Sequence, residues 1–175
     1  MADSTVQIPG RIRAVSLPRE QVEVPLLQRL FAYWDKARAG RPWLRQADLR
    51  PEEFVFALPY VALIDRPPET GPGLRIRLVG EEIRNEGVGY LRDRLIEDIE
   101  PAWYRDHLVQ RYRAIFTSGE PTFEAVHVVY DVRNYYYHRL LLPLTVGGEQ
   151  VDIVLVATIY TEPHARFLNP DAHLG

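Results

Sequence analysis

Three runs of β-branched and aromatic residues near the C-terminal end form the clearest hydrophobic pattern of the chain. They cover residues 121–130, 134–144 and 150–160, and Asp, Asn and Gly residues bound them, as is typical of β-strands. The Gly147-Gly148 pair between the last two runs favours a two-residue turn, because both central residues of such a turn need positive φ. The pattern therefore predicts two β-hairpins that share the middle strand.

Turns at residues 131–134 and 146–149 also predict which side chains share a face, because successive residues of a strand point to opposite faces. In this register His127 lies directly opposite His138, and His138 lies opposite Ala157. One predicted face is apolar apart from the two histidines and comprises Phe123, Ala125, His127, Val129, Tyr136, His138, Leu140, Leu142, Ile153, Leu155, Ala157 and Ile159. The other, mixed face comprises Glu124, Val126, Val128, Tyr130, Tyr135, Tyr137, Arg139, Leu141, Asp152, Val154, Val156, Thr158 and Tyr160. Both faces are expected to need a cover.

A helix is predicted over residues 25–39, where apolar residues recur at helical spacing. Pro25 suits the first helical position, and Gly40 suits the position just past the end. The broad apolar stripe of this helix is expected to cover the mixed face of the sheet. The alternative is that the stripe pairs with its own copy across a dimer axis.

A second, longer helix is predicted over residues 101–117. Tyr112 lies close to the centre of its apolar side. Arg105 also lies on that side, near the helix start, where it could bind a ligand carboxylate or extend into water. His107 points away from the stripe and is predicted to be a surface residue.

Two shorter strands, over residues 60–65 and 74–79, lie before the second helix. The full order is helix, two strands, short helices, long helix and three strands, which predicts an α+β fold. Residues 1–24 are expected to form an arm, mostly unstructured or a capping strand. Residues 25–161 are expected to form one domain and residues 162–175 a polar tail.

Composition removes several classes of function. The chain of 175 residues has a net charge of −3, which gives no electrostatic case for binding nucleic acid or an anionic membrane. It contains no cysteine, so disulfides, thiolate catalysis and cysteine-ligated metals are excluded. No signal peptide and no apolar run of bilayer length is recognisable, so a cytoplasmic protein is expected.

Several short motifs occur in a characteristic order: Leu30-Phe-Ala-Tyr-Trp34 with Arg38, Gly40 and Pro42, then Asp48-Leu-Arg-Pro51, Leu58-Pro59, Arg75-Ile-Arg-Leu-Val-Gly80, Gly87, Gly119-Glu-Pro121 and Leu142-Pro-Leu144. Over residues 25–160 this series of motifs resembles that of the compact single-domain bacterial PAS proteins. Glu81 departs from the family pattern, which usually has a small hydroxyl residue after the glycine. Arg92-Asp93 also departs from it, at a position where a turn glycine is usual.

The resemblance implies a PAS-like five-stranded antiparallel sheet, with an N-terminal helix against one face and a helical cover over the other. It implies a sensory or interaction module that binds a small ligand between the long helix and the sheet, or that signals through dimerisation. A homodimer through the N-terminal helix or a sheet face, and a signalling protein as partner, are the expected associations. The resemblance carries no catalytic residues, and the identity of any cofactor stays open.

A ligand pocket is expected between the long helix and the apolar sheet face. Ala157 is small and lies opposite His138 in the predicted register, which leaves volume there, and the imidazoles and the Tyr136 hydroxyl could orient a ligand. The predicted ligand-binding residues are Arg105, Tyr112, His127, Tyr136, His138 and Ala157. The alternative is an ordinary core in which Tyr112 fills the gap and the two histidines bond each other.

Catalytic and metal chemistry find little support in the residues. The apolar face has no Asp or Glu, whereas a ketosteroid-isomerase-like cone fold, the alternative architecture for an enzyme or binding protein, needs an inward carboxylate. Opposed imidazoles without a nearby carboxylate make a poor metal site. The Glu124 and Arg139 side chains are expected to form a minor pair at the surface. The sequence therefore predicts a non-catalytic protein without a metal site.

Overall fold

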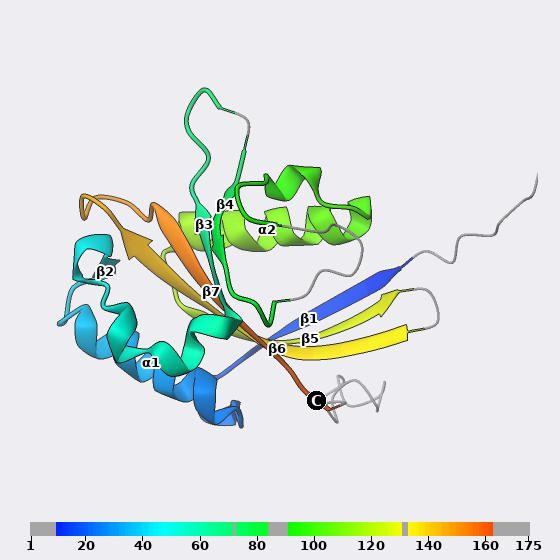
Figure 1. Cartoon of the computed structure of the whole chain (residues 1–175), viewed down its shortest axis with the longest axis horizontal. Helices are drawn as coiled ribbons and strands as arrows, with labels where there is room; N and C mark the ends of the chain where they lie inside the picture. The colour runs from blue at the N-terminus through cyan, green and yellow to red at the C-terminus, as the bar shows by residue number, and fades with distance from the viewer. Residues whose placement is uncertain (1–9, 72, 84–90, 131–132, 163–175) are drawn as a thin grey trace, which may run out of the picture.

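The computed structural model describes residues 10–71, 73–83, 91–130 and 133–162, and within them the chain forms an α+β fold around one mostly antiparallel sheet. Six strands lie in the order β1-β5-β6-β7-β3-β4, and the short strand β2 pairs in parallel with β6 (Figure 1). The strands are β1 (Arg11–Leu17), β2 (Leu44–Arg45), β3 (Val61–Asp65), β4 (Arg75–Val79), β5 (Thr122–Tyr130), β6 (Arg133–Thr145) and β7 (Ile153–Tyr160).

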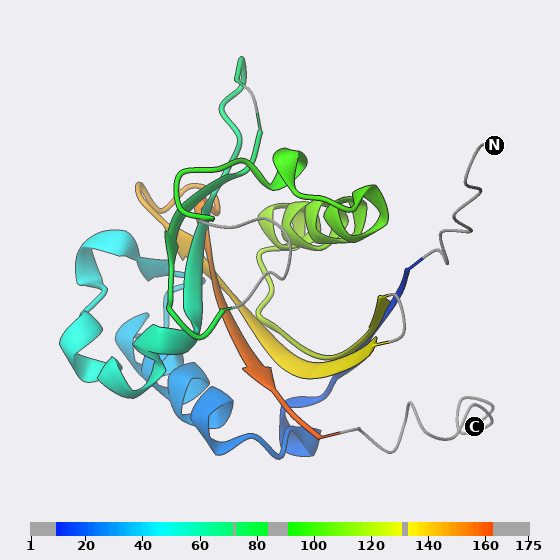
Figure 2. The ribbon, with the colours of Figure 1, turned by 45° about the vertical axis from the view of Figure 1, so that its right-hand side comes forward.

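Two α-helices cover this sheet from opposite sides, as Figure 2 shows. Helix α1 spans Pro25–Ala37 and has its proline at the first turn, and helix α2 spans Ala102–Ser118. Gly119 ends α2 with a φ of 68°, and its backbone N–H donates to the Ile115 carbonyl. Short 3-10 turns connect the elements at Arg19–Gln21, Gln46–Asp48, Pro51–Glu53, Val55–Tyr60 and Ile96–Asp98.

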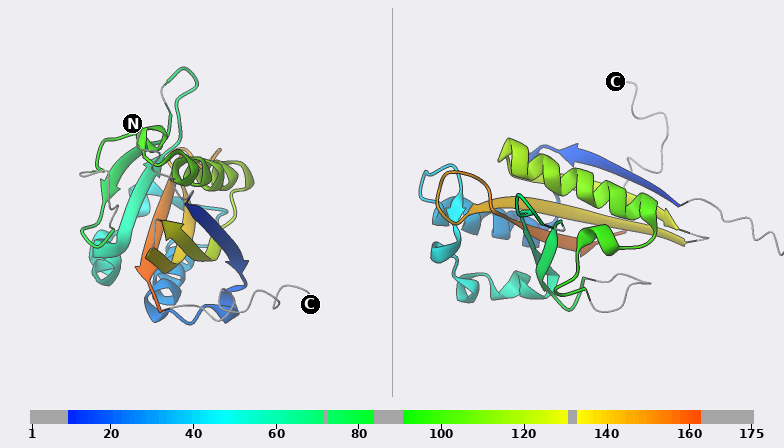
Figure 3. Two further views of the ribbon diagram at one scale, coloured as in Figure 1. Left: turned by 90° about the vertical axis from the view of Figure 1, so that its right-hand side faces the viewer. Right: turned by 90° about the horizontal axis from the view of Figure 1, so that it is seen from above.

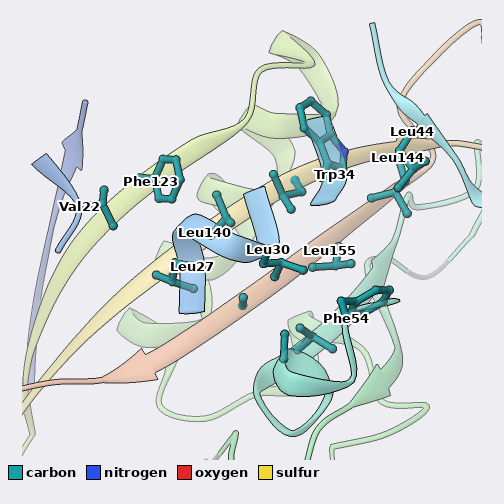
Figure 4. Packing of buried hydrophobic residues seen from close by; sticks show 14 of the residues in the cluster. Val22, Leu27, Leu30, Trp34, Leu44, Phe54, Phe123, Leu140, Leu144 and Leu155 are labelled. Atoms are coloured by element: carbon teal, nitrogen blue, oxygen red, sulfur yellow. The ribbon is translucent and has the colours of Figure 1, made fainter. Parts of the chain in front are cut away.

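Helix α1 packs on the apolar face of the sheet, not on the mixed face as predicted. Leu27, Leu30 and Trp34 are buried there among the leucines of β6 and residues of β7 (Figure 4). The Trp34 indole N–H, the polar group of this buried stripe, donates to the Pro143 carbonyl at 3.0 Å. An almost wholly apolar helix face therefore meets an almost wholly apolar sheet face, and each covers the other from water.

Helix α2 packs on the mixed face. Its buried residues Leu108, Tyr112, Ile115 and Phe116 contact a cluster that includes Val154 on β7. The two views of Figure 3 show α2 running across one side of the sheet, with α1 on the other. This arrangement follows from polar complementarity, because α2 also carries His107 and Arg111, which contact the charged side chains of the mixed face.

The strand register differs from the prediction by two residues in both hairpins. His127 lies opposite Tyr136, and His138 lies opposite Ala125 and Ile159, so the histidines are not directly opposed. Because the shift is even, the predicted membership of the two faces is unchanged.

The turn of the second hairpin is wider than a two-residue turn, which explains the shift there. The strands end at Thr145 and resume at Ile153. The Asp152 carboxylate accepts hydrogen bonds from the Val146 N–H at 2.7 Å and the Thr145 hydroxyl at 3.3 Å, which organises the loop. The predicted turn of the first hairpin includes residues 131 and 132, which lie outside the described residues.

The N-terminal segment contributes a strand to the sheet. β1 pairs antiparallel with β5 over its whole length, from Arg11 opposite Val129 to Leu17 opposite Phe123. Within the described part of residues 1–24, residues 11–17 therefore form an edge strand and residues 19–21 a 3-10 turn. Of the predicted tail, residues 163–175 lie outside the described residues.

Candidate functional site

A cavity of about 320 Å³ lies on the mixed face, between the first turn of α2 and the ends of β5, β6 and β7. Its wall contains five tyrosines, one tryptophan and two glutamates, together with one proline and one valine. The lining residues are Glu82, Glu100, Pro101, Trp103, Tyr104, Val128, Tyr130, Tyr135, Tyr137 and Tyr160. Its size and its largely aromatic wall are those of a site for a small organic ligand.

Strand alternation and the helix start bring these aromatic residues together. Tyr135 and Tyr137 are two residues apart on β6, so both point to the face that α2 covers. Trp103 and Tyr104 lie in the first turn of α2 and form the helix side of the cavity wall. The ring centroids of Trp103 and Tyr130 are 5.9 Å apart. Gly10 allows this position of Trp103, because a Cβ at Gly10 would lie 1.9 Å from the indole ring.

A smaller cavity of about 60 Å³ continues the first one along α2 and shares Tyr104, Tyr137 and Tyr160 with it. Most of its wall is apolar and comes from β3, β4 and the segment that precedes α2. Its polar lining also includes Tyr112 and Arg139. The combined hollow therefore has an aromatic outer part and an apolar inner part that ends at a buried cation.

Tyr137 lies where the two cavities meet. Its side chain is only 5% exposed, and among the described residues its hydroxyl makes no hydrogen bond of standard geometry, although Tyr104 lies close enough to act on it. Burial, and after it the neighbouring Tyr104, raise the pKa of Tyr137 well above its ordinary value. The phenol therefore stays protonated, and its O–H is a buried donor that a ligand oxygen could satisfy.

A buried charge cluster lies behind this wall. The Glu124 carboxylate accepts hydrogen bonds from Nε of Arg139 at 2.8 Å and from Nη2 at 2.5 Å, and it also pairs with Arg111 of α2. Glu124 and Arg139 are each 1% exposed, so the prediction of a minor surface pair is wrong. The two residues lie directly opposite each other on β5 and β6, and α2 covers both.

His107 belongs to the same cluster, and its predicted position at the surface is wrong. Its Nε2 lies 3.1 Å from Nη2 of Arg139. Arginine has no acceptor, so this imidazole nitrogen accepts the hydrogen bond and the ring proton is on Nδ1. Burial, and then the Arg139 charge, lower the pKa of His107 to about 4. Burial alone would lower the pKa of Arg139, but the neighbouring Tyr137 and Glu124 raise it above its ordinary value.

The structure does not bring the six predicted ligand-binding residues together, because α2 covers the face opposite to the one expected. Tyr112 lies on α2 and lines the inner cavity, whereas His127, Tyr136, His138 and Ala157 lie on the other face of the sheet. Arg105 lies near the outer cavity, where its guanidinium pairs with Glu100 at 3.5 Å and with Asp106 at 3.2 Å.

The four predicted residues on the apolar face take part in ordinary packing. His127 stacks on Tyr136 with ring centroids 4.4 Å apart, and its Nε2 bonds Oδ1 of Asn134 at 2.8 Å. His138 is buried, and Ala157 is fully buried in the core that α1 covers. The predicted pocket between the long helix and this face is therefore wrong in its location.

The aromatic residues of the observed cavity were not predicted as a site. Tyr130, Tyr135, Tyr137 and Tyr160 were all assigned to the mixed face, and this concentration of tyrosine was the available signal. An aromatic wall of this kind favours ligand binding over simple packing only when the helix above it leaves volume, which the sequence pattern does not report.

The described part of the chain holds no group of three or more His, Asp or Glu side chains that could bind a metal ion. None of its helices is both long enough and apolar enough to cross a membrane. Comparison with protein-family models, curated proteins and solved structures yields no match to this chain.

Proposed function

We propose that this protein is a non-catalytic, PAS-like sensory module that binds a small organic ligand in the cavity between α2 and the mixed sheet face. The element order supports the proposal. Strands β3 and β4, which precede the long helix α2, and strands β5, β6 and β7, which follow it, lie in one sheet, and the sequence resemblance implies this layout. β1 and the short strand β2 are additions to that layout.

The cavity at Tyr137 is the observation that carries this proposal. A volume of about 320 Å³ falls within the usual range for small-molecule sites. A buried hydroxyl without a hydrogen bond of standard geometry costs free energy, and a well-placed acceptor atom on a ligand would recover it. Packing alone would favour phenylalanine at this position.

The cone-fold enzyme is less well supported. The buried carboxylate Glu124 lies on the mixed face, but Arg139 and Arg111 engage its oxygens. A carboxylate held by two guanidinium groups is a poor proton acceptor, because protonation would break both pairs. Glu124 is therefore better suited to a structural role than to proton transfer.

Signalling through a homodimer and a protein partner remains part of the proposal, as does a cytoplasmic location. Leu27, Leu30 and Trp34 of α1 are buried against the sheet of their own chain. A dimer through α1 would therefore use the other side of this helix.

Native mass spectrometry of the full chain after incubation with a cell-derived small-molecule extract tests the proposal. We expect a defined organic mass to be retained by the wild type and lost in Val128→Phe, which fills the cavity from β5. The matched control is Val146→Phe, because Val146 is 60% exposed in a distant loop. Absence of any retained mass, or equal retention by both variants, would overturn the proposal.

A further inference from the structure

The outer cavity has a distinctive charge pattern. Six of its ten lining residues are aromatic and two are glutamates, and no Lys, Arg or His lines it among the described residues. The face of an aromatic ring carries partial negative charge, and it attracts a cation that lies within about 6 Å of the ring centroid. The ring faces and the carboxylates of the wall therefore both attract a positively charged ligand.

The rings are inclined to one another rather than stacked flat. Trp103 and Tyr130 meet at 43°, Trp103 and Tyr104 at 70°, and Tyr137 and Tyr160 at 63°, with centroids 5.8–5.9 Å apart. Parallel stacking would bury the ring faces against each other. Inclined rings cover less of each other's faces, and this suits a rounded ammonium head better than a flat aromatic ligand.

The two carboxylates lie at the mouth of the cavity. Glu82 is exposed and the Glu100 side chain is 74% exposed, so both can attract a cation from solution. Arg105 pairs with Glu100, but this contact is long, at 3.5 Å, and Arg105 also bonds Asp106. An anionic ligand would pass both carboxylates without meeting a cation among the described residues of the outer wall.

The inner end has the opposite polarity, which orients a ligand. The Arg139 guanidinium lies 5.9 Å from the Tyr137 ring centroid, and Arg111 lies close behind it at Glu124. Glu124 offsets part of this positive charge. A cationic head is therefore favoured at the outer end, while an oxygen acceptor of the ligand is favoured near the Tyr137 hydroxyl.

From these observations we infer that the cavity binds a small organic ammonium ion that also carries an oxygen acceptor. The inference rests on the proposed function and specifies its ligand class. The ammonium head lies against the faces of Trp103 and Tyr130 near the two glutamates, and the ligand oxygen accepts a hydrogen bond from the Tyr137 hydroxyl. Arg105, which the sequence suggested for a ligand carboxylate, instead competes with the ligand for Glu100.

The three indole N–H signals of the ¹⁵N-labelled full chain provide a reporter with two internal controls. Trp103 lines the cavity, whereas Trp34 and Trp43 donate their indole protons to the Pro143 and Gly119 carbonyls elsewhere. The probes are choline, its neutral isostere 3,3-dimethylbutan-1-ol, and the anion 3,3-dimethylbutanoate. Choline should shift the Trp103 signal saturably and leave the other two unchanged, and the neutral isostere should bind about tenfold more weakly.

Surface variants test the charge argument without disturbing the core. Glu100→Gln should weaken choline binding several-fold and reduce its salt dependence, whereas Arg105→Gln should strengthen binding or leave it unchanged. Glu52→Gln is the matched control, because Glu52 is an exposed carboxylate outside the cavity wall. If Arg105 bound a ligand carboxylate, 3,3-dimethylbutanoate would bind the wild type and this binding would be lost in Arg105→Gln.

The outcomes separate this inference from the proposed function. If the neutral isostere or the anion shifts Trp103 at equal or lower concentration than choline, the cation inference is overturned and the binding site stands. If choline leaves Trp103 unchanged, the cation inference is likewise overturned. If, in addition, the extract yields no retained mass, the proposed function falls with it.

Discussion

Glu124→Gln tests how much the buried ion pair of Glu124 and Arg139 contributes to the stability of the protein. The substitution keeps the shape of the side chain and removes its charge. Arg139 would then be a cation that is 1% exposed, without its counter-ion. Breaking a buried pair in this way costs about 3–5 kcal/mol. Glutamine keeps one acceptor oxygen for Arg139, and the Arg111 side chain is 29% exposed and can turn to water, so we expect about 3 kcal/mol.

Urea unfolding followed by circular dichroism measures this loss, and for a chain of this size it corresponds to a fall in Tm of roughly 6–12 °C. The double variant Glu124→Leu/Arg139→Met should recover most of the loss, because an apolar pair leaves no buried charge. The exposed Glu120→Gln is the neutral control. A loss below about 1 kcal/mol for Glu124→Gln would refute the reasoning, since it would mean that Arg139 is not isolated from other counter-charges or water.

Three further predictions concern the core and the histidine. Ala157→Leu should destabilise the protein by about 1–3 kcal/mol in urea unfolding through overpacking, since Ala157 is fully buried beneath α1; unchanged stability would indicate a void there. Leu30→Ala should cost about 2–5 kcal/mol in the same assay, and a loss near zero would contradict the packing of α1 on the sheet. The pKa of His107 is lowered to about 4, so the unfolded chain takes up this proton below pH 6.5 before the folded chain does. Stability should therefore fall more steeply from pH 6.5 to 4 in the wild type than in His107→Gln, as measured by thermal unfolding across that range; parallel curves would show that His107 is not held neutral.

The elements of the fold were largely accessible from the sequence because each depends on local periodicity. The strand alternation of β5, β6 and β7 and the helical spacing of residues 25–37 and 102–118 are properties of short segments. The choice of face for each helix is not local. The stripe of α1 could cover either face, and the buried pair of Glu124 with Arg139, which needs His107 and Arg111, decides it.

The register depended on loop geometry that the Gly147-Gly148 pair did not reveal. The loop widens because the Asp152 carboxylate binds the backbone of Val146, and as a result His138 lies opposite Ile159 of β7 rather than opposite Ala157. The candidate site was missed for a related reason. Its volume depends on where the first turn of α2 lies above the sheet, and this is a property of tertiary packing rather than of spacing.

The close approach of Gly10 to Trp103 has a thermodynamic consequence for the edge strand. The indole lies against the backbone at the start of β1, and β1 is held along β5, whose Val128 lines the same cavity. A ligand that pushes the Trp103 ring toward Gly10 must displace β1. A ligand that holds the ring in place must favour the pairing of β1 with β5. By reciprocity, the free energy that ligand binding contributes to docking of the strand equals the free energy that docking contributes to ligand affinity. The amide protons of β1 would register occupancy of the cavity as a change in their exchange with solvent.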